Sequence, residues 1–295
     1  MSARERAFTL DIHGEQAVAI LAEPAAARSD CGVLVVVGGP QYRVGSHRQF
    51  VLLARALAEA GFPVMRFDFR GMGDSSGAMR DFTRVGDDIA VAIDAFLRES
   101  TGLRRVVLWG LCDGASASCF HMANDPRVAG AVLLNPWVRS DAGEARVMLK
   151  HYYLQRLMSP DFWRKLLSGR FRAGESLGSL GGMLRKASTA SASGAGSDVG
   201  KVDYSRAPLV EGVPGGLSAS GRPALVLLSG NDFVAAEFEA AMDGSQSWRV
   251  LTDTGHVRSR KLADANHTFS SAVWREDVFH ATRSWLEKNI LGEAA

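Results

Sequence analysis

Short apolar runs alternate, in the first half of the chain, with stretches whose apolar residues recur every three or four positions. The runs predict β-strands and the spaced stretches predict helices, because the two structures repeat their side-chain directions at different periods. Valine and leucine runs separated by helices are typical of a parallel sheet buried on both faces. We expect strands at 17–24, 33–39, 62–70, 105–110 and 129–136, and helices at about 47–60, 84–99 and 113–124.

The pattern changes after residue 138. Residues 139–185 carry aromatic residues and leucines at helical spacing, and the segment 186–200 is too poor in large apolar residues to pack, which is typical of a flexible linker. Strand-like runs resume at 223–230 and 248–253, and a final helix is expected at about 272–290. We therefore expect an α/β core formed by residues 1–138 and 221–295, with a helical lid inserted at 139–220.

One turn between a predicted strand and a predicted helix has the form of a nucleophile elbow. In "GLCDG", Cys112 stands between Gly110 and Gly114, and the glycines let strand and helix approach closely. A thiol at a helix N-terminus is favoured as thiolate by the helix dipole. The alternative is a buried structural cysteine, which is the role we expect for Cys119, and we assign no role to Cys31.

A thiol nucleophile needs a base, and the base needs an orienting acid. In hydrolases with such an elbow the acid and then the base follow the nucleophile along the chain. His267, just before the final helix, is the preferred base, and His256, behind the run 248–253, is the alternative. Asp232 follows the predicted strand 223–230 and is the preferred acid, with Asp141 as second choice and turn formation as the structural alternative.

Acyl chemistry also needs backbone N–H groups directed at the developing oxyanion. We expect one from Asp113 and one from the loop after strand 33–39, where Pro40 has no N–H, so that Gln41 is preferred and Gly39 remains open. The Asp113 carboxylate is unexpected here because it would repel the oxyanion. A cation from the same loop, Arg43 or Arg48, is one compensation, and a carboxylate turned to solvent is the other.

Composition narrows the class of protein. The 295 residues have a formal net charge of +2, and no basic cluster is interleaved with aromatic residues, which argues against a nucleic-acid partner. We find no signal peptide and no apolar span long enough for a membrane, so we expect a cytoplasmic protein without stable membrane insertion. Three cysteines argue against a disulfide framework, and no Cys/His spacing indicates a metal site or another cofactor.

The motifs "GGPQ", "FDFRGMGDSSG", "GLCDGAS", "SGND" and "NHTF", in this order, resemble the α/β-hydrolase superfamily. The run from "GGPQYRVGSHRQF" to "GMGDSSG", together with "GLCDGAS", resembles more narrowly the exosortase A system-associated hydrolase 1 family. The resemblance implies an α/β-hydrolase fold with a mostly parallel central sheet and a Cys-His-Asp hydrolase encoded beside bacterial extracellular polysaccharide synthesis. Dienelactone hydrolases of this fold also use cysteine, whereas most relatives carry serine.

The sequence thus predicts an acyl hydrolase or acyltransferase that acts on an ester or thioester of a small-molecule or sugar-linked substrate. Arg43, Tyr153 and Trp163 are candidate substrate contacts, and the basic 139–220 segment would suit an acidic sugar or a phosphopantetheine thioester. The alternatives are a lactone hydrolase and a catalytically inert binding partner of the polysaccharide machinery. We expect the loop "FRGMGDSSG", with Arg70 and Asp74, to be structural.

Overall fold

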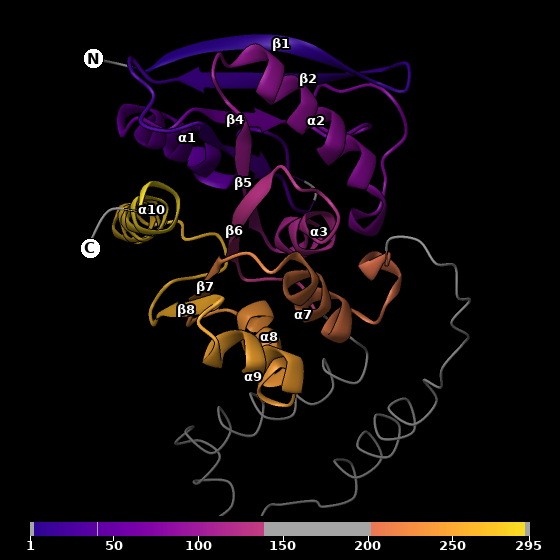
Figure 1. Ribbon diagram of the computed structural model, residues 1–295, viewed down its shortest axis with the longest axis vertical. Helices are drawn as coiled ribbons and strands as arrows, with labels where there is room; N and C mark the ends of the chain where they lie inside the picture. Colours follow the sequence, from indigo (N-terminus) through magenta and orange to yellow (C-terminus); the bar gives the residue numbers. More distant parts are fainter. Residues whose placement is uncertain (1–2, 40, 139–201, 293–295) are drawn as a thin grey trace, which may run out of the picture.

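The computed structural model describes residues 3–39, 41–138 and 202–292 (Figure 1). These residues form one 8-stranded sheet in the order β1-β2-β4-β3-β5-β6-β7-β8. Only the β1/β2 and β2/β4 pairs are antiparallel, so the expected mostly parallel sheet is confirmed. The strands are β1 Arg4–Ile12, β2 Glu15–Glu23, β3 Cys31–Val36, β4 Val64–Phe67, β5 Arg105–Leu111, β6 Val128–Leu134, β7 Ala224–Ser229 and β8 Val257–Leu262.

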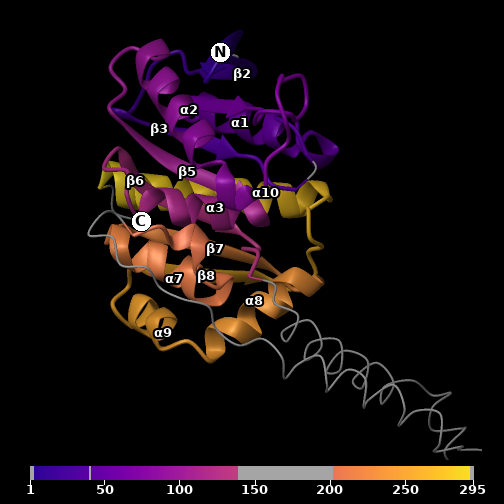
Figure 2. The ribbon, with the colours of Figure 1, turned by 90° about the vertical axis from the view of Figure 1, so that its right-hand side faces the viewer.

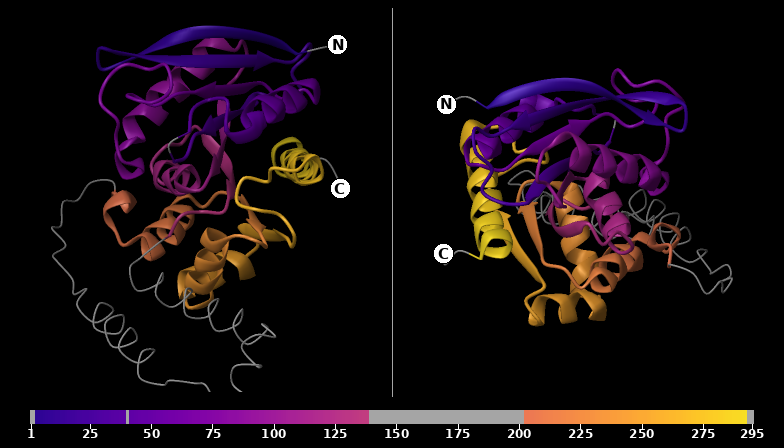
Figure 3. Two further views of the ribbon diagram at one scale, coloured as in Figure 1. Left: turned by 180° about the vertical axis from the view of Figure 1, so that it is seen from behind. Right: turned by 45° about the horizontal axis from the view of Figure 1, so that its top comes forward.

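Helices cover both faces of the sheet. Figures 1 and 2 show α1 and α10 on one face and α2, α3 and α7 on the other. In Figure 3, α10 (yellow) lies on the same face of the sheet as α1. It is separate from α8 and α9 (orange), which lie at the end of the sheet formed by β7 and β8. The helices are α1 Gln49–Glu59, α2 Gly86–Glu99, α3 Asp113–Met122, α7 Leu209–Ser220, α8 Phe233–Asp243, α9 Gln246–Asp253 and α10 Ala272–Leu286, with short turns η1 Ser46–Arg48, η2 Phe82–Arg84, η3 Tyr204–Arg206 and η4 Glu287–Leu291.

The central strands β3, β4 and β7 are buried along their whole length, because helices pack on both sides of them. On the α1/α10 face, Trp109 of β5 packs edge-on against Phe50 with ring centroids 5.7 Å apart, and its Nε1–H donates to Thr282 Oγ1 of α10 at 3.3 Å. One aromatic residue thereby ties the strand that leads into the elbow to two helices.

The strand expected at 248–253 is wrong, and strands β1 and β8 are missing from the sequence-based assignment. Residues 248–253 belong to helix α9 and not to a strand, since Trp248 and Leu251 are buried at helical spacing and the Ser245 side chain caps Trp248 N at 3.2 Å. The last strand is β8 at the sheet edge, whose four central residues are exposed, so no apolar run marks it. His256 therefore precedes the last strand and does not follow it.

The described residues reach into the segment expected as a lid. Helix α7, with buried Val213 and Leu217, packs against α3 beside the sheet. The remainder of that segment, residues 139–201, lies outside the described residues. Among the described residues, no helix combines the length and apolar character needed to cross a membrane.

Candidate active site

Cys112 lies on a strained turn between β5 and α3. Its φ of 60° is in the left-handed region that non-glycine residues rarely adopt. Its N–H donates to Leu134 O at 2.8 Å and its carbonyl accepts from Trp137 N at 3.2 Å, which fixes the turn. The turn closes because Gly110 is in tight contact with Gly114, where an added Cβ would meet the Gly114 carbonyl carbon at 2.6 Å. The side chain of Cys112 is thereby held at the N-terminus of α3.

Asp232 and His267 come from two loops at the same edge of the sheet. Asp232 caps α8, accepting from Ala235 N at 3.1 Å, and His267 lies between β8 and α10. His267 Nδ1 donates to Asp232 Oδ2 at 2.9 Å. The loops are also joined by Asn231 N, which donates to Ala265 O at 2.9 Å, and by Gly230 N, which donates to Leu262 O at 2.8 Å.

His267 also contacts Cys112, so the structure brings together the three side chains singled out from the sequence. Burial lowers the pKa of His267, but the hydrogen bonds with Asp232 and with the Cys112 side chain outweigh burial and raise that pKa to about 10. Burial likewise works to raise the pKa of Asp232, and its hydrogen bond with His267 holds that pKa below the ordinary value. His267 therefore carries a proton at neutral pH, between a carboxylate and a sulfur.

The Asp113 carboxyl folds back onto backbone N–H groups. Its Oδ1 accepts a hydrogen bond from Gly39 N, which is one of the two candidates for the second oxyanion donor. Burial raises the pKa of Asp113, while N–H groups of Gly39, Gly114 and Asp113 itself oppose that rise. Gln41, the preferred donor from the sequence, directs its Oε1 to Ser46 N at 3.1 Å within its own loop.

The cation expected beside Asp113 binds elsewhere, and this expectation is wrong for Arg43. Its guanidinium pairs with Asp68 and, at 2.6 Å, with Asp74. Arg48 is exposed, and no contact with Asp113 is found for it among the described residues. Arg43 is thus held by two carboxylates of the loop after β4.

That loop is held by a second ion pair. The guanidinium of Arg70 binds the fully buried Asp88 of α2, with Nε 2.9 Å from Oδ1, and the Arg70 N–H donates to the same carboxylate at 2.9 Å. These contacts agree with the structural interpretation of "FRGMGDSSG".

Asn135 is a further polar residue at this site, beyond those that the sequence motifs single out. This fully buried residue after β6 has a φ of 44°, and its Nδ2 donates to His267 O at 3.0 Å and to Ser229 Oγ at 2.8 Å. Its Oδ1 accepts from Ser229 N at 2.9 Å. Asn135 thus connects β6 and β7 to the histidine loop, which is the segment 263–271 between β8 and α10 that carries His267. A polar residue directly after a buried apolar run, within "LLNP", was the available signal.

His256, the alternative base, does not reach this place. His256 is exposed and bonds Thr254 Oγ1 at 2.9 Å, at the opposite end of β8 from the elbow. Tyr153, Trp163 and Asp141 lie outside the described residues. No group of three or more metal-ligating side chains is found within the described part of the chain.

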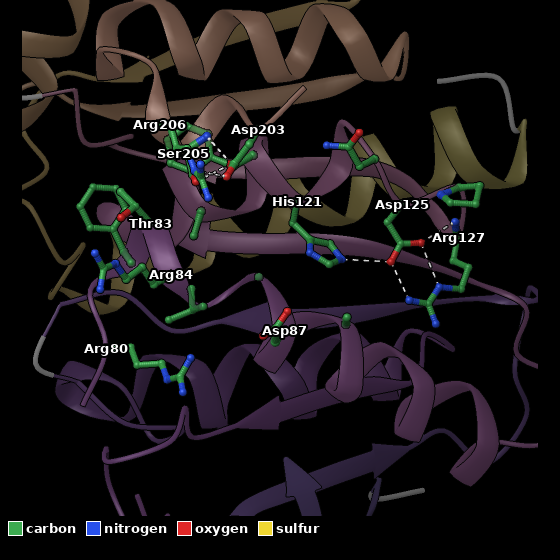
Figure 4. A pocket seen from close by; sticks show the side chains of 18 residues that line it. Arg80, Thr83, Arg84, Asp87, His121, Asp125, Arg127, Asp203, Ser205 and Arg206 are labelled. Atoms are coloured by element: carbon green, nitrogen blue, oxygen red, sulfur yellow. Dashed lines mark hydrogen bonds and ion pairs between the residues drawn. The ribbon is translucent and has the colours of Figure 1, made fainter. Parts of the chain in front are cut away.

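A cavity of about 1030 Å³ runs beside α3 but contains none of the three side chains (Figure 4). At one end, Asp125 accepts from His121 Nε2 at 3.0 Å and from Arg127 Nη2 at 2.6 Å, and at the other, Arg206 pairs with Asp203 at 2.9 Å. We place the candidate site at the elbow and not in this cavity, because the cavity's charged groups are largely paired with one another.

Comparison with known structures agrees with the fold. An esterase from Pyrococcus furiosus superposes with a TM-score of 0.63 at 15% identity, covering 97% of this chain and 91% of that one. A dienelactone hydrolase from Anabaena variabilis gives 0.59 at 15% identity, covering 97% and 98%. A proline iminopeptidase from Mycobacterium smegmatis gives 0.57 at 16% identity, covering 97% and 99%. At these identities the likeness shows a shared fold.

Sequence comparison adds a family. Human protein ABHD12B is 30% identical over 116 residues, which is 37% of this chain and only 31% of that protein. Residues 31–178 match the Hydrolase_4 family, described as serine aminopeptidase S33, and that segment contains the elbow with its cysteine. The chain belongs to this hydrolase family, and its fold is the α/β-hydrolase fold.

Proposed function

We propose that the protein is an acyl hydrolase that cleaves an ester or thioester with Cys112 as nucleophile, His267 as proton carrier and Asp232 as orienting acid. The observation that carries the proposal is the continuous contact from Cys112 through His267 to Asp232, with the thiol held on a strained elbow. Strain of this kind is maintained by surrounding structure and is concentrated at functional sites.

The charge state of His267 suits a thiol. A serine hydroxyl needs a neutral imidazole to take its proton. A thiolate is already the nucleophile and instead needs a protonated imidazole, which donates a proton to the leaving group. Because the pKa of His267 is raised to about 10, the protonated form is present at neutral pH.

In the first half-reaction the Cys112 sulfur attacks the carbonyl carbon, and the carbonyl oxygen becomes an oxyanion. The tetrahedral species collapses, the bond to the leaving oxygen or sulfur breaks, and Nε2 of His267 gives that atom its proton. Water then attacks the acyl thioester, returning a proton to His267 and releasing the acid. Transfer to a sugar hydroxyl follows the same course with the hydroxyl in place of water.

In this mechanism the backbone N–H groups of Asp113 and Gly39 donate hydrogen bonds to the oxyanion. We prefer Gly39 to Gln41 in this role because the Gly39 N–H donates to Asp113 Oδ1 beside the elbow. One well-placed donor is worth roughly 100-fold in rate or more.

The dienelactone hydrolase among the structural neighbours keeps lactone opening as a second candidate. It is the same reaction with the leaving group still attached to the acyl chain. The resemblance to the exosortase A system-associated family supports a substrate from extracellular polysaccharide synthesis. The lid expected within residues 139–220 remains part of this proposal.

The test is formation of an acyl-enzyme. The protein is mixed with 4-nitrophenyl acetate, and its intact mass and peptide map are recorded during turnover. We expect one acetyl group on Cys112, no acetylation or turnover in Cys112→Ala, and unchanged kinetics in His256→Ala. Turnover that survives Cys112→Ala, or the absence of turnover with all esters, thioesters and lactones supplied, would reject the proposal in favour of an inert binding protein.

A further inference from the structure

Two groups need the same backbone donor. The proposed oxyanion requires the N–H of Gly39, and in the structure this N–H already donates to Oδ1 of Asp113. An N–H points along one direction and serves one strong acceptor at a time. The oxyanion and the Asp113 carboxyl therefore compete for it.

The position of the carboxyl is closely defined by its surroundings. A Cβ added to Gly38 would lie 2.5 Å from Asp113 Oδ1 and 2.7 Å from Gly114 N, so the carboxyl sits in the narrow space between the β3 loop and the first turn of α3. The N–H groups of Gly114 and Asp113 contribute to holding it. A turn N–H together with the first N–H groups of a helix forms a site for an anion.

Within the described part of the chain, no cation is found paired with this carboxyl. Arg43 is bound to Asp68 and Asp74, and the charged group that acts on Asp113 is another carboxylate, Asp81. An ion pair would have fixed Asp113 as part of a permanent network. The Asp113 carboxyl instead accepts hydrogen bonds from backbone N–H groups, and an incoming oxyanion can replace it as their acceptor.

We infer that the Asp113 carboxyl is an internal occupant of the oxyanion site, which the substrate must displace before Cys112 can acylate. The inference rests on the proposed function and concerns the regulation of the same site. Displacement needs only rotation of the side chain, and no bond is made or broken. Turnover is thereby restricted to substrates whose binding elsewhere in the site offsets the loss of these hydrogen bonds.

The alternative is that Asp113 acts as a clamp, holding Gly39 in place for catalysis. The two roles predict opposite effects of removing the carboxyl. Asp113→Ala empties the site, and Asp113→Asn removes the charge while keeping the shape. Asp81→Asn is the matched control, since it removes an exposed carboxylate near the elbow whose hydrogen bonds run to Thr83 and not to Gly39.

With 4-nitrophenyl acetate we expect kcat/KM to rise about tenfold or more in Asp113→Ala, which frees the Gly39 N–H. The rise should be smaller in Asp113→Asn, whose neutral amide oxygen still occupies the site but competes less well for that N–H, and Asp81→Asn should change kcat/KM by about twofold or less because it frees no donor. A fall, or no change, in both folded Asp113 variants would overturn the inference. A fall would assign the clamp role instead.

A second measurement is independent of turnover. In Cys112→Ala protein, the amide proton of Gly39 is followed by NMR. We expect a large upfield shift when Asp113→Ala is added, and none with Asp81→Asn. If the Gly39 resonance shifts but no variant hydrolyses any ester, the occupant is real and the proposed function fails. A Gly39 resonance that ignores Asp113→Ala overturns the inference itself.

Discussion

At the scale of single residues, the three cysteines occupy different environments. Burial raises the pKa of Cys31 to about 12 and raises that of Cys119 further, so both thiols stay protonated at neutral pH. Cys112 is the half-buried one and contacts a protonated imidazole. Sequence reasoning could separate Cys112 from the others because glycines flank it, but it could not foresee the raised pKa of His267, which arises from contacts across three loops.

Asn135 is a positioning residue whose removal should affect the histidine loop. Glycine tolerates the positive φ at this position, so Asn135→Gly isolates the loss of three side-chain hydrogen bonds. We expect the free energy of unfolding in urea to fall by about 2–4 kcal/mol, because buried groups lose their partners, and kcat to fall more than KM rises. Asn289→Ala, which removes one bond to Trp285 O within a helix end, should cost about 1 kcal/mol or less. Equal costs for the two variants would contradict this role.

At the scale of elements, the elbow depends on two glycines. In Gly110→Ala the new Cβ would meet the backbone of Gly114 at 2.6 Å, so β5 and α3 must separate. We expect a loss of about 3 kcal/mol or more in unfolding free energy, in line with severe overpacking of a core. Gly86→Ala in α2, where nothing lies within 4 Å of the added Cβ, should instead stabilise by up to about 1 kcal/mol. The thermal unfolding of both variants tests this prediction. Equal changes in stability would show that the close approach of β5 and α3 at Gly110 is not required.

The turn between α3 and β6 is stabilised by Asp125. Burial works to raise the pKa of Asp125, but its hydrogen bonds with Arg127 and His121 hold that pKa well below the ordinary value. A lowered pKa stabilises the folded state above the unfolded-state pKa of about 4, and this stabilisation is lost as the pH falls below it. Asp125→Asn should cost about 3 kcal/mol at pH 7, and the difference from the wild type should shrink in urea titrations at pH 3. A difference independent of pH would exclude this ion pair as its cause.

Prediction of elements succeeded where burial produced an apolar run and failed where it did not. Strands β3, β5, β6 and β7 are buried and were found from their valines and leucines. Strand β8 lies at the edge of the sheet, and its four central residues are exposed to solvent. It therefore carries charged residues in place of an apolar run. Without β8, His256 is expected after the last strand, whereas it precedes that strand in the structure. The preference for His267 is unaffected, because that preference depends on the loop before α10.

At the scale of the whole molecule, the order of the strands brings the site together. Residues 112, 232 and 267 follow β5, β7 and β8, which run parallel, so their carboxyl ends lie along one edge of the sheet. Ligands of open α/β sheets bind outside this edge. The order of the motifs along the sequence was sufficient to predict the fold and the edge. The competition of Asp113 with an oxyanion for Gly39 was not predictable, since it depends on the direction of one N–H.

The proposed mechanism requires His267 to activate Cys112. The most direct measurement is brief alkylation with iodoacetamide at pH 6, followed by peptide mass spectrometry of all three cysteines. We expect Cys112 to react about tenfold or more faster than Cys31 and Cys119, and His267→Ala to remove this advantage, because an unassisted thiol is almost wholly protonated at that pH. Equal labelling of the three cysteines, or labelling of Cys112 that is indifferent to His267→Ala, would contradict it.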